Sequence, residues 1–186
     1  MISTSDFRNG MVIIVDGNLM EIVEFQHVKP GKGGAFVRTK LKNILTGRVL
    51  EKTFRAGERL EEARVEEQIW EYIYNDGDLY HFMNGDTYEQ LAVGKDLVGD
   101  QAEWLKENSN AALRFYEGKV IDVHVPDFVE LEISHCEPAV QGDRVSGTTK
   151  PATLETGATV QVPLFLNEGD TVKVDTRTRR YIERVG

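Results

Sequence analysis

Short segments in which apolar and polar residues alternate recur along the whole chain, and a turn signal follows most of them. Two examples run from Ala35 to Leu41 and from Val49 to Phe54, and turn sequences occur at Asp16-Gly17-Asn18, Thr46-Gly47 and Asn84-Gly85-Asp86. Alternation with a period of two is typical of strands with one buried face, and Asp-Gly or Asn-Gly pairs favour hairpins. The chain is therefore predicted to be all-β.

At 186 residues the chain is long enough for several small barrels, and its strand segments fall into three groups. We expect domains at residues 1–64, 65–127 and 128–186. The first group predicts a small, highly curved antiparallel barrel. The second predicts five strands and one short helix, over residues 101–108, which suits the five-stranded Greek-key barrel of the oligonucleotide-binding (OB) type.

The third group is similar in size and pattern to the second. Its strands are expected at Phe128 to Cys136, Thr159 to Leu166, Thr171 to Asp175 and Tyr181 to Val185. Residues 137–153 are too polar for a strand along their full length and contain several Gly and Pro residues. We therefore expect a loop there.

The net charge of -9 hides a basic tract inside an acidic chain. Such an asymmetry indicates a polyanionic partner that approaches one part of the molecule. The alternative is that these cations are simply the solvent-facing positions of two strands. The tract covers residues 29–55, where Glu51 alone opposes Lys29, Lys32, Arg38, Lys40, Lys42, Arg48, Lys52 and Arg55.

The sequence Gly31-Lys32-Gly33-Gly34 lies between two strand segments of this tract, where it would form the tip of a hairpin. It does not match a nucleotide-binding phosphate loop, because no Ser or Thr follows the lysine and the next segment is a strand. Two interpretations of Lys32 stay open. It is either a solvated turn residue or a lysine displayed for insertion into a partner or for modification by another enzyme.

A smaller basic segment lies near the C-terminus and includes Tyr181. Interleaved arginine and aromatic residues can stack on bases or span phosphates. The alternative is a frayed terminus without such a role. In this segment Asp175 and Glu183 are outnumbered by Lys173, Arg177, Arg179, Arg180 and Arg184.

No catalytic, metal or cofactor site is evident in the sequence, and we expect none. Cys136 directly follows His135, and adjacent strand residues face opposite sides, so the cysteine is expected to be a small buried apolar residue. His27, His81 and His124 lack the close ligand spacing of zinc sites. The single cysteine, the polar start and the short apolar runs favour a cytoplasmic protein without a membrane partner.

Four blocks of sequence resemble the bacterial elongation factor P family, in the family's order and over the whole chain. The resemblance implies an N-terminal KOW/SH3-like barrel followed by two OB barrels. It also implies a non-enzymatic translation factor that binds the 70S ribosome between the P and E sites, stabilises peptidyl-tRNA and relieves stalling at consecutive prolines. The blocks are Lys29-Pro30-Gly31-Lys32-Gly33-Gly34-Ala35-Phe36-Val37, Gly142-Asp143 with Lys150-Pro151-Ala152-Thr153-Leu154-Glu155-Thr156-Gly157, Val160-Gln161-Val162-Pro163-Leu164-Phe165, and Lys173-Val174-Asp175-Thr176-Arg177-Thr178.

Carried over position by position, the resemblance implies that Lys32 contacts the CCA end of the P-site tRNA and is modified by a partner enzyme. RNA contacts of the same domain are implied for Lys29, Gly31, Gly33, Arg38, Lys40 and Lys42. In the third domain they are implied for Gly142, Asp143, Arg144, Tyr181 and Arg184. The chain departs from the family at Arg144, Arg179 and Arg180, whose added positive charge predicts stronger and less specific RNA contact.

Two other classes of protein stay open. A general single-strand RNA-binding or chaperone module needs only the barrels and the basic segments, and it predicts tight binding to free oligonucleotides, which the net acidity disfavours. A paralogue with a different reading preference would share the fold, but the intact lysine tip disfavours it. In every case we expect a monomer.

Overall fold

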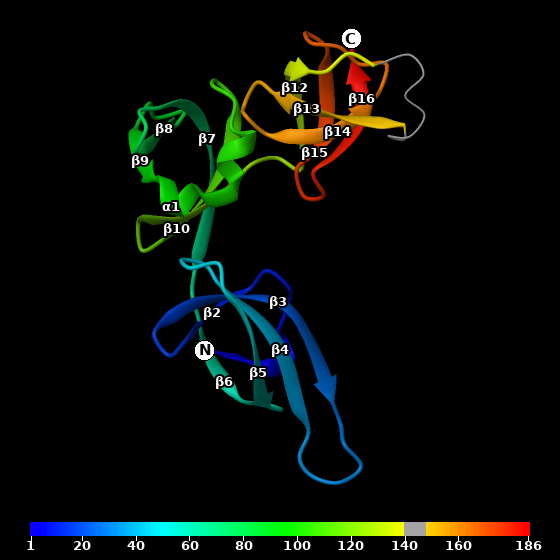
Figure 1. Cartoon of the computed structure of the whole chain (residues 1–186). Coiled ribbons are helices and arrows are strands. Elements are labelled where there is room, and N and C mark those ends of the chain that lie inside the picture. The colour runs from blue at the N-terminus through cyan, green and yellow to red at the C-terminus, as the bar shows by residue number, and fades with distance from the viewer. Residues whose placement is uncertain (140–147) are drawn as a thin grey trace. The chain divides into compact units, whose positions relative to one another are not determined.

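The computed structural model describes residues 1–139 and 148–186 and shows an all-β protein (Figure 1). Three sheets follow one another along the chain, one of six strands and two of five. The described residues contain one α-helix, α1 (Lys95–Val98). The predicted fold class, a series of small β-barrels with one short helix, is confirmed. The chain forms two compact units: unit 1 comprises residues 1–67 and 114–122, and unit 2 comprises residues 68–113 and 123–186.

The N-terminal sheet has the strand order β1-β6-β2-β3-β4-β5. Its strands are β1 (Ile2–Ser3), β2 (Val12–Val15), β3 (Asn18–Val28), β4 (Phe36–Asn43), β5 (Val49–Arg55) and β6 (Arg59–Glu62). A 3-10 turn, η1 (Thr4–Asp6), follows β1. The predicted turn at Asp16-Gly17 closes the β2–β3 hairpin, with φ angles of 50° and 79°.

Inward-facing residues of adjacent strands build the core of unit 1. Val37 and Leu41 of β4 pack with Ile22 of β3 and Phe54 of β5, and each of them is at most 2% exposed. The Phe7 ring meets the Phe54 ring edge-on, with 5.8 Å between the ring centroids. Because inward and outward residues alternate along a strand, the intervening positions of β4 face solvent.

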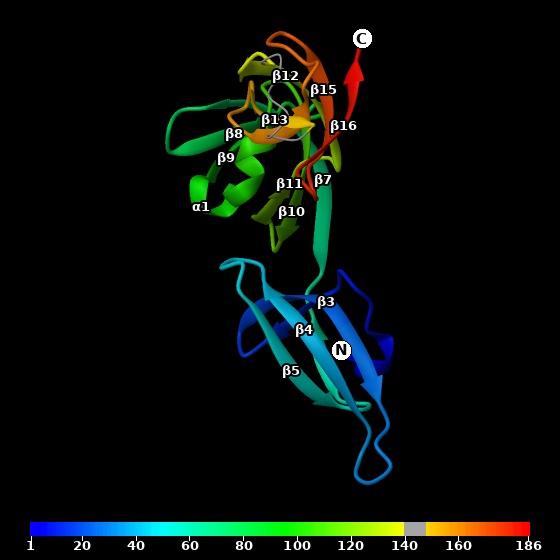
Figure 2. The same ribbon diagram turned by 45° about the vertical axis from the view of Figure 1, so that its right-hand side comes forward.

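Strands β3 and β4 form a long hairpin whose connecting loop extends beyond the sheet (Figure 2). Their pairing runs from Met20 opposite Asn43 to Val28 opposite Phe36. A register shift leaves Val23 as an extra residue in β3, and such bulges bend and twist a strand. The two arms end at the connecting loop, residues 29–35.

The other two sheets share one topology. In each, the first strand along the chain is central, with the second and third on one side and the fourth and fifth on the other. The second sheet has the order β11-β10-β7-β8-β9, with β7 (Val65–Asn75), β8 (Leu79–Met83), β9 (Gln90–Gly94), β10 (Asn110–Tyr116) and β11 (Lys119–His124). The third has the order β14-β13-β12-β15-β16, with β12 (Phe128–Cys136), β13 (Thr149–Leu154), β14 (Thr159–Pro163), β15 (Thr171–Asp175) and β16 (Arg180–Val185).

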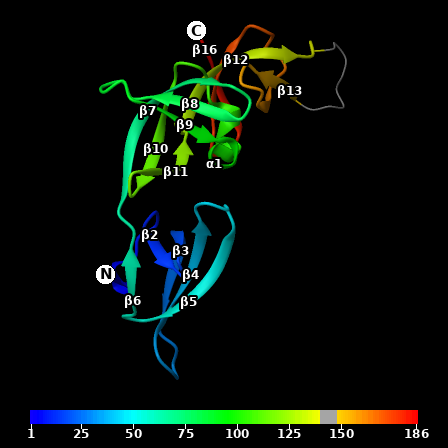
Figure 3. The same ribbon diagram turned by 90° about the vertical axis from the view of Figure 1, so that its left-hand side faces the viewer.

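The helical segment lies earlier in the chain than the sequence predicts. Helix α1 lies beside β8 and β9 (Figure 3), and a 3-10 turn, η2 (Gly99–Trp104), continues it. Residues 105–108 are not helical, so the predicted range of 101–108 is wrong in its second half. Gly99 has a φ of 56°, which ends the α-helix after one turn, while Val98 and Trp104 bury the two ends of the segment.

Strand β13 contradicts the loop that we expected over residues 137–153. It pairs with β12 and β14, and its residues Lys150, Ala152 and Leu154 are buried. Two residues of this strand do not fit the usual alternation of apolar and polar residues. Lysine is rarely buried, and a proline such as Pro151 is rare inside a strand.

Candidate nucleic-acid interface

The loop between β3 and β4 displays Lys32 at the end of the long hairpin. Lys32 and the glycines beside it, Gly31, Gly33 and Gly34, are all exposed. Gly33 has a φ of 96°, a conformation that residues with a Cβ rarely adopt. A Cβ added to any of the three glycines would meet no described atom within 4 Å. Another molecule can therefore approach this backbone closely.

Three of the predicted RNA-binding cations lie on one face of β4. Arg38, Lys40 and Lys42 alternate with the buried Val37, Thr39 and Leu41, so they share the face that is turned away from the core. The pleat of a single strand thus aligns them at two-residue intervals. They line the arm that leads to Lys32.

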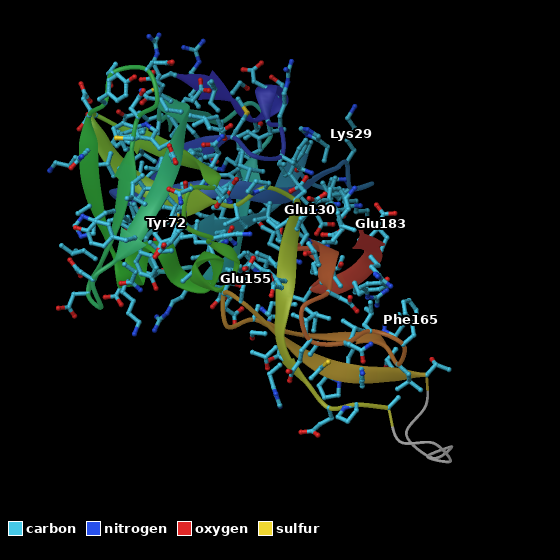
Figure 4. All side chains as sticks on the ribbon, turned by 90° about the horizontal axis from the view of Figure 1, so that it is seen from above. Lys29, Tyr72, Glu130, Glu155, Phe165 and Glu183 are labelled. Atoms are coloured by element: carbon cyan, nitrogen blue, oxygen red, sulfur yellow. The ribbon has the colours of Figure 1, made fainter. Side chains whose placement is uncertain are left out.

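Most of the hairpin cations form no ion pair within the part of the chain that the structure describes. Lys40 lies 3.6 Å from Glu24, but both side chains are largely exposed, so this ion pair is weak. Figure 4 shows Lys29 extending away from the ribbon. Because unpaired cations produce a positive field, the hairpin attracts polyanions. Within residues 1–139 and 148–186 no ion pair is formed by Lys29, Lys32, Arg38 or Lys42.

Arg114 of β10 explains why Lys42 is unpaired, although Glu21 lies directly opposite it in the β3–β4 register. The Glu21 carboxylate accepts hydrogen bonds from the Arg114 guanidinium at 3.3 and 3.4 Å. The same guanidinium donates to Asp122 of β11 at 2.8 Å, and this bond raises the pKa of Arg114 above its ordinary value. No sequence pattern singles out Arg114, because its partners lie 8 and 93 positions away.

The C-terminal basic segment is largely neutralised inside unit 2. Among the described residues, Arg180 alone of the five cations has no ion pair. Tyr181 is half-buried and Arg184 is exposed, so both predicted RNA-binding residues of β16 keep some access to solvent. The other cations form the pairs Lys173–Glu183, Arg177–Asp175, Arg179–Glu103 and Arg184–Asp170.

Arg179 forms contacts within unit 2, while the RNA contact that the sequence predicts for it stays a prediction. It occupies the turn between β15 and β16 with a left-handed backbone, at a φ of 59°. Its guanidinium pairs with Glu103 and lies 5.3 Å from the centroid of the Trp104 ring. The main-chain carbonyl of Glu103 also accepts a hydrogen bond from the Thr156 hydroxyl. These contacts join the η2 segment to the third sheet.

Other predicted residues are placed as follows. Gly142, Asp143 and Arg144 lie outside the described residues, so their roles stay predictions. Cys136 is buried, as expected for a small apolar side chain. Within the described ranges no three His, Cys, Asp or Glu residues could hold a metal ion together, and no helix there is long and apolar enough to cross a bilayer.

The fold and the site together define a class: an all-β protein of serial small barrels that carries a glycine-rich hairpin with an exposed lysine at its tip and further cations along its arms. Three family models match it in consecutive parts. They are the elongation factor P KOW-like domain over residues 3–60, the elongation factor P OB domain over residues 65–123 and the elongation factor P C-terminal domain over residues 129–184. The chain belongs to the elongation factor P family.

Curated relatives agree over the full length. The elongation factor P of Caldanaerobacter subterraneus subsp. tengcongensis is 54% identical over 185 residues, which cover 100% of both chains. Those of Natranaerobius thermophilus and Saccharopolyspora erythraea are each 55% identical, over 100% of this chain and 98% of the relative. The chain is therefore a translation elongation factor.

Solved structures show a related fold at lower identity. Eukaryotic translation initiation factor 5A from Methanococcus jannaschii is 22% identical, with a TM-score of 0.52 over 66% of this chain and 94% of that one. This likeness concerns the fold alone. The matched KOW-like and OB domains confirm the barrel types that the sequence predicts, while the exact domain boundaries stay a prediction.

Proposed function

We propose that this chain binds the 70S ribosome between the P and E sites, stabilises peptidyl-tRNA and stimulates peptide-bond formation, which relieves stalling at consecutive prolines. The observation that carries this proposal is the exposed Lys32 at the tip of a hairpin whose cations are mostly unpaired within the described part of the chain. Membership of the elongation factor P family supports it. The chemical step belongs to the ribosome, so the chain is not itself an enzyme.

Lys32 contacts the CCA end of the P-site tRNA. Proline is a poorly placed nucleophile, and holding the peptidyl-tRNA in a near-attack geometry removes several kcal/mol from a barrier that is largely positional. Gly31 and Gly33 let the loop backbone approach RNA, since a glycine leaves no side chain in the way. A partner enzyme modifies the Lys32 amine, which is exposed and has no ion pair among the described residues.

The remaining hairpin cations bind phosphates of the acceptor arm. Lys29, Arg38 and Lys42 form no ion pair with another described residue, so their charges are available for this role. Lys40 exchanges its weak, solvent-exposed pair with Glu24 for a phosphate. Binding is therefore salt-dependent, because phosphate contacts release counterions.

The third barrel adds contacts to the ribosome. Tyr181 and Arg184 bind RNA there, and the separation of 3.9 Å between Arg184 and Asp170 leaves the guanidinium able to reach a phosphate. Gly142, Asp143 and Arg144 contact the E-site codon. We further propose that the factor acts as a cytoplasmic monomer with domains at residues 1–64, 65–127 and 128–186.

The test is the rate of each peptide bond on a Pro-Pro-Pro reporter in reconstituted translation, with protein purified from its native host. We expect wild-type protein to accelerate the third proline step and Lys32→Ala to lose most of that acceleration. Lys32→Arg tests the positive charge separately from the modification, because it keeps a cation at the tip but removes the amine that is modified.

The matched control is Lys95→Ala, which removes another exposed lysine, in helix α1, and should accelerate like the wild type. A reporter without prolines controls for general effects on translation. Equal acceleration by Lys32→Ala and wild type would contradict the role of Lys32. Tight binding to free oligonucleotides without acceleration would instead favour the RNA-binding module.

A further inference from the structure

A groove in unit 2 lies between the β13–β14 hairpin and the start of β16, outside the lysine hairpin. Its volume is about 560 Å³, within the usual range for small-ligand sites. It combines hydroxyl groups, an amide, a guanidinium and an aromatic ring, with no carboxylate among the described residues of its lining. The lining is Thr149, Thr159, Val160, Gln161, Pro163, Thr178, Arg179, Arg180 and Tyr181.

Arg180 gives this groove a positive charge that no described residue neutralises through an ion pair. Asp175 lies directly opposite Arg180 in the β15–β16 register, yet its carboxylate does not pair with it. That carboxylate accepts hydrogen bonds from the Arg177 guanidinium at 3.1 and 3.2 Å and from the Arg177 main-chain N–H at 2.9 Å. The Arg177 hydrogen bond also holds the pKa of Asp175 below its ordinary value. Asp175 therefore stays ionised and pairs with Arg177 rather than with Arg180.

Gln161 presents hydrogen-bond donors to the same groove. Its amide oxygen accepts a hydrogen bond from the Thr149 hydroxyl at 3.3 Å. The amide nitrogen, with two N–H groups, has no partner among the described residues. Because Gln161 and Thr149 lie on neighbouring strands, this bond orients the amide and leaves its donors for a ligand.

A second cation lies in the same barrel wall. Lys150 follows Thr149 on β13, but its side chain faces the other side of the strand and is 7% exposed. Its Nζ finds no hydrogen-bond partner among the described residues. With no ion pair to another described residue, this ammonium adds positive potential to the wall that carries Thr149.

We infer that this groove binds a nucleotide of single-stranded RNA, with its phosphate at Arg180 and its base against Tyr181 and Gln161. Strands two and three of an OB barrel, with the loop between strands four and five, are the usual oligonucleotide surface of that fold. Here those elements are β13, β14 and the β15–β16 turn. The inference rests on the proposed function, because it supplies an RNA contact for a factor on the ribosome.

A charge-reversal pair at position 161 tests the inference. Gln161→Glu is isosteric and keeps an acceptor for Thr149, but it places an anion where RNA would bind. Gln161→Lys places a cation there. We expect the first to weaken ribosome binding about tenfold and the second to keep or strengthen it, with the slope of log K against log salt becoming steeper by about 1 for the lysine variant.

The matched controls are Gln90→Glu and Gln90→Lys, which make the same changes at an exposed position of β9 in unit 2. They should bind ribosomes like the wild type, and thermal unfolding should show that all four variants are folded. A merely structural role of Gln161 would weaken binding in both variants alike. Equal shifts in both Gln161 variants, or no difference from the Gln90 pair, would overturn the inference.

Replacing Gln161 with p-benzoylphenylalanine identifies the ligand by photocrosslinking on ribosomes. Crosslinks to ribosomal or messenger RNA support the inference and distinguish the two sources, whereas crosslinks only to ribosomal proteins, or none, overturn it. The proline reporter reads out the proposed function separately. Acceleration without an RNA crosslink refutes the groove alone, and a crosslink without acceleration refutes the proposed function alone.

Discussion

Replacing Arg114 with alanine removes the guanidinium that bridges the Glu21 and Asp122 carboxylates of unit 1. The side chain of Arg114 is 11% exposed, and those of Asp122 and Glu21 are 16% and 22% exposed. Without the guanidinium, the Glu21 and Asp122 carboxylates stay mostly buried and lose the hydrogen bonds that Arg114 donates. The fold then still bears the desolvation of two mostly buried carboxylates but has lost the guanidinium that compensated it, which is the largest cost in breaking such a cluster.

The magnitude follows from burial and distance. Breaking a fully buried ion pair by removing one partner costs about 3 to 5 kcal/mol. The bonds to Glu21 are long, at 3.3 and 3.4 Å, and every member keeps some contact with water. We therefore expect Arg114→Ala to lower the free energy of unfolding by about 2 to 3 kcal/mol. Glu21→Gln removes only the weaker arm and should cost about 1 kcal/mol.

Urea unfolding, followed by circular dichroism and by tryptophan fluorescence, measures these changes. Both tryptophans, Trp70 and Trp104, belong to unit 2, so agreement between the two probes would show that the whole chain unfolds together. The control is Arg8→Ala, at an exposed arginine of unit 1, which should stay within about 0.5 kcal/mol of the wild type. A loss below about 0.5 kcal/mol for Arg114→Ala would refute the reasoning.

Two further predictions concern unit 2. Arg179→Ala should lower the free energy of unfolding by about 1 kcal/mol, since it loses the Glu103 pair and the Trp104 contact but keeps the left-handed backbone. Arg179→Gly should lose less, because glycine relieves that backbone, and thermal unfolding of the two variants compares them. The His81 hydrogen bond lowers the pKa of Asp76 from 3.8 to about 2, so the stability it contributes is present above pH 4 and lost as pH falls through about 2. Unfolding midpoints between pH 5 and pH 2 should fall less steeply in Asp76→Asn, and an identical pH profile would contradict this.

The strands that the sequence predicts best are those whose pattern is local. The segments Phe128–Cys136, Leu79–Met83 and Thr171–Asp175 match the observed strands residue for residue. In Phe128–Cys136 and Thr171–Asp175 apolar residues largely alternate with polar ones, and Leu79–Met83 lies between turn residues at 75–78 and 84–86. Period-two alternation and turn chemistry are properties of neighbouring residues, so they can be seen without knowing the fold.

Elements with a residue that breaks the pattern could not be predicted. In β13, the inward position taken by Lys150 would ordinarily be apolar, and only the pairing with β12 and β14 shows that this segment is a strand. The helix is missed for a related reason. One α-helical turn, Lys95–Val98, is too short to show helical periodicity, and its stability comes from the burial of Val98 against the barrel.

The sequence predicts the parts of the candidate site that depend on neighbouring residues, and it does not predict those that depend on residues far away in the chain. The tip of the hairpin follows from turn residues that flank Lys32, but whether a cation is free depends on residues far away in sequence. The C-terminal segment shows this, because it looks as basic as the hairpin. There Arg177 holds the carboxylate of Asp175, so Arg180, which lies opposite that carboxylate, is left unpaired while the rest of the segment is neutral.

On the lysine hairpin, too, two cations compete for one carboxylate. Lys42 faces Glu21 across the β3–β4 ladder, and an isolated hairpin would pair them. Arg114 binds that carboxylate instead, because a planar guanidinium can bridge Glu21 and Asp122 with two or more hydrogen bonds, which an ammonium cannot do equally well. One arginine outside the hairpin thus keeps a lysine inside it available. Losing Arg114 should therefore weaken phosphate binding at Lys42 as well as the fold, since Glu21 would then neutralise the lysine.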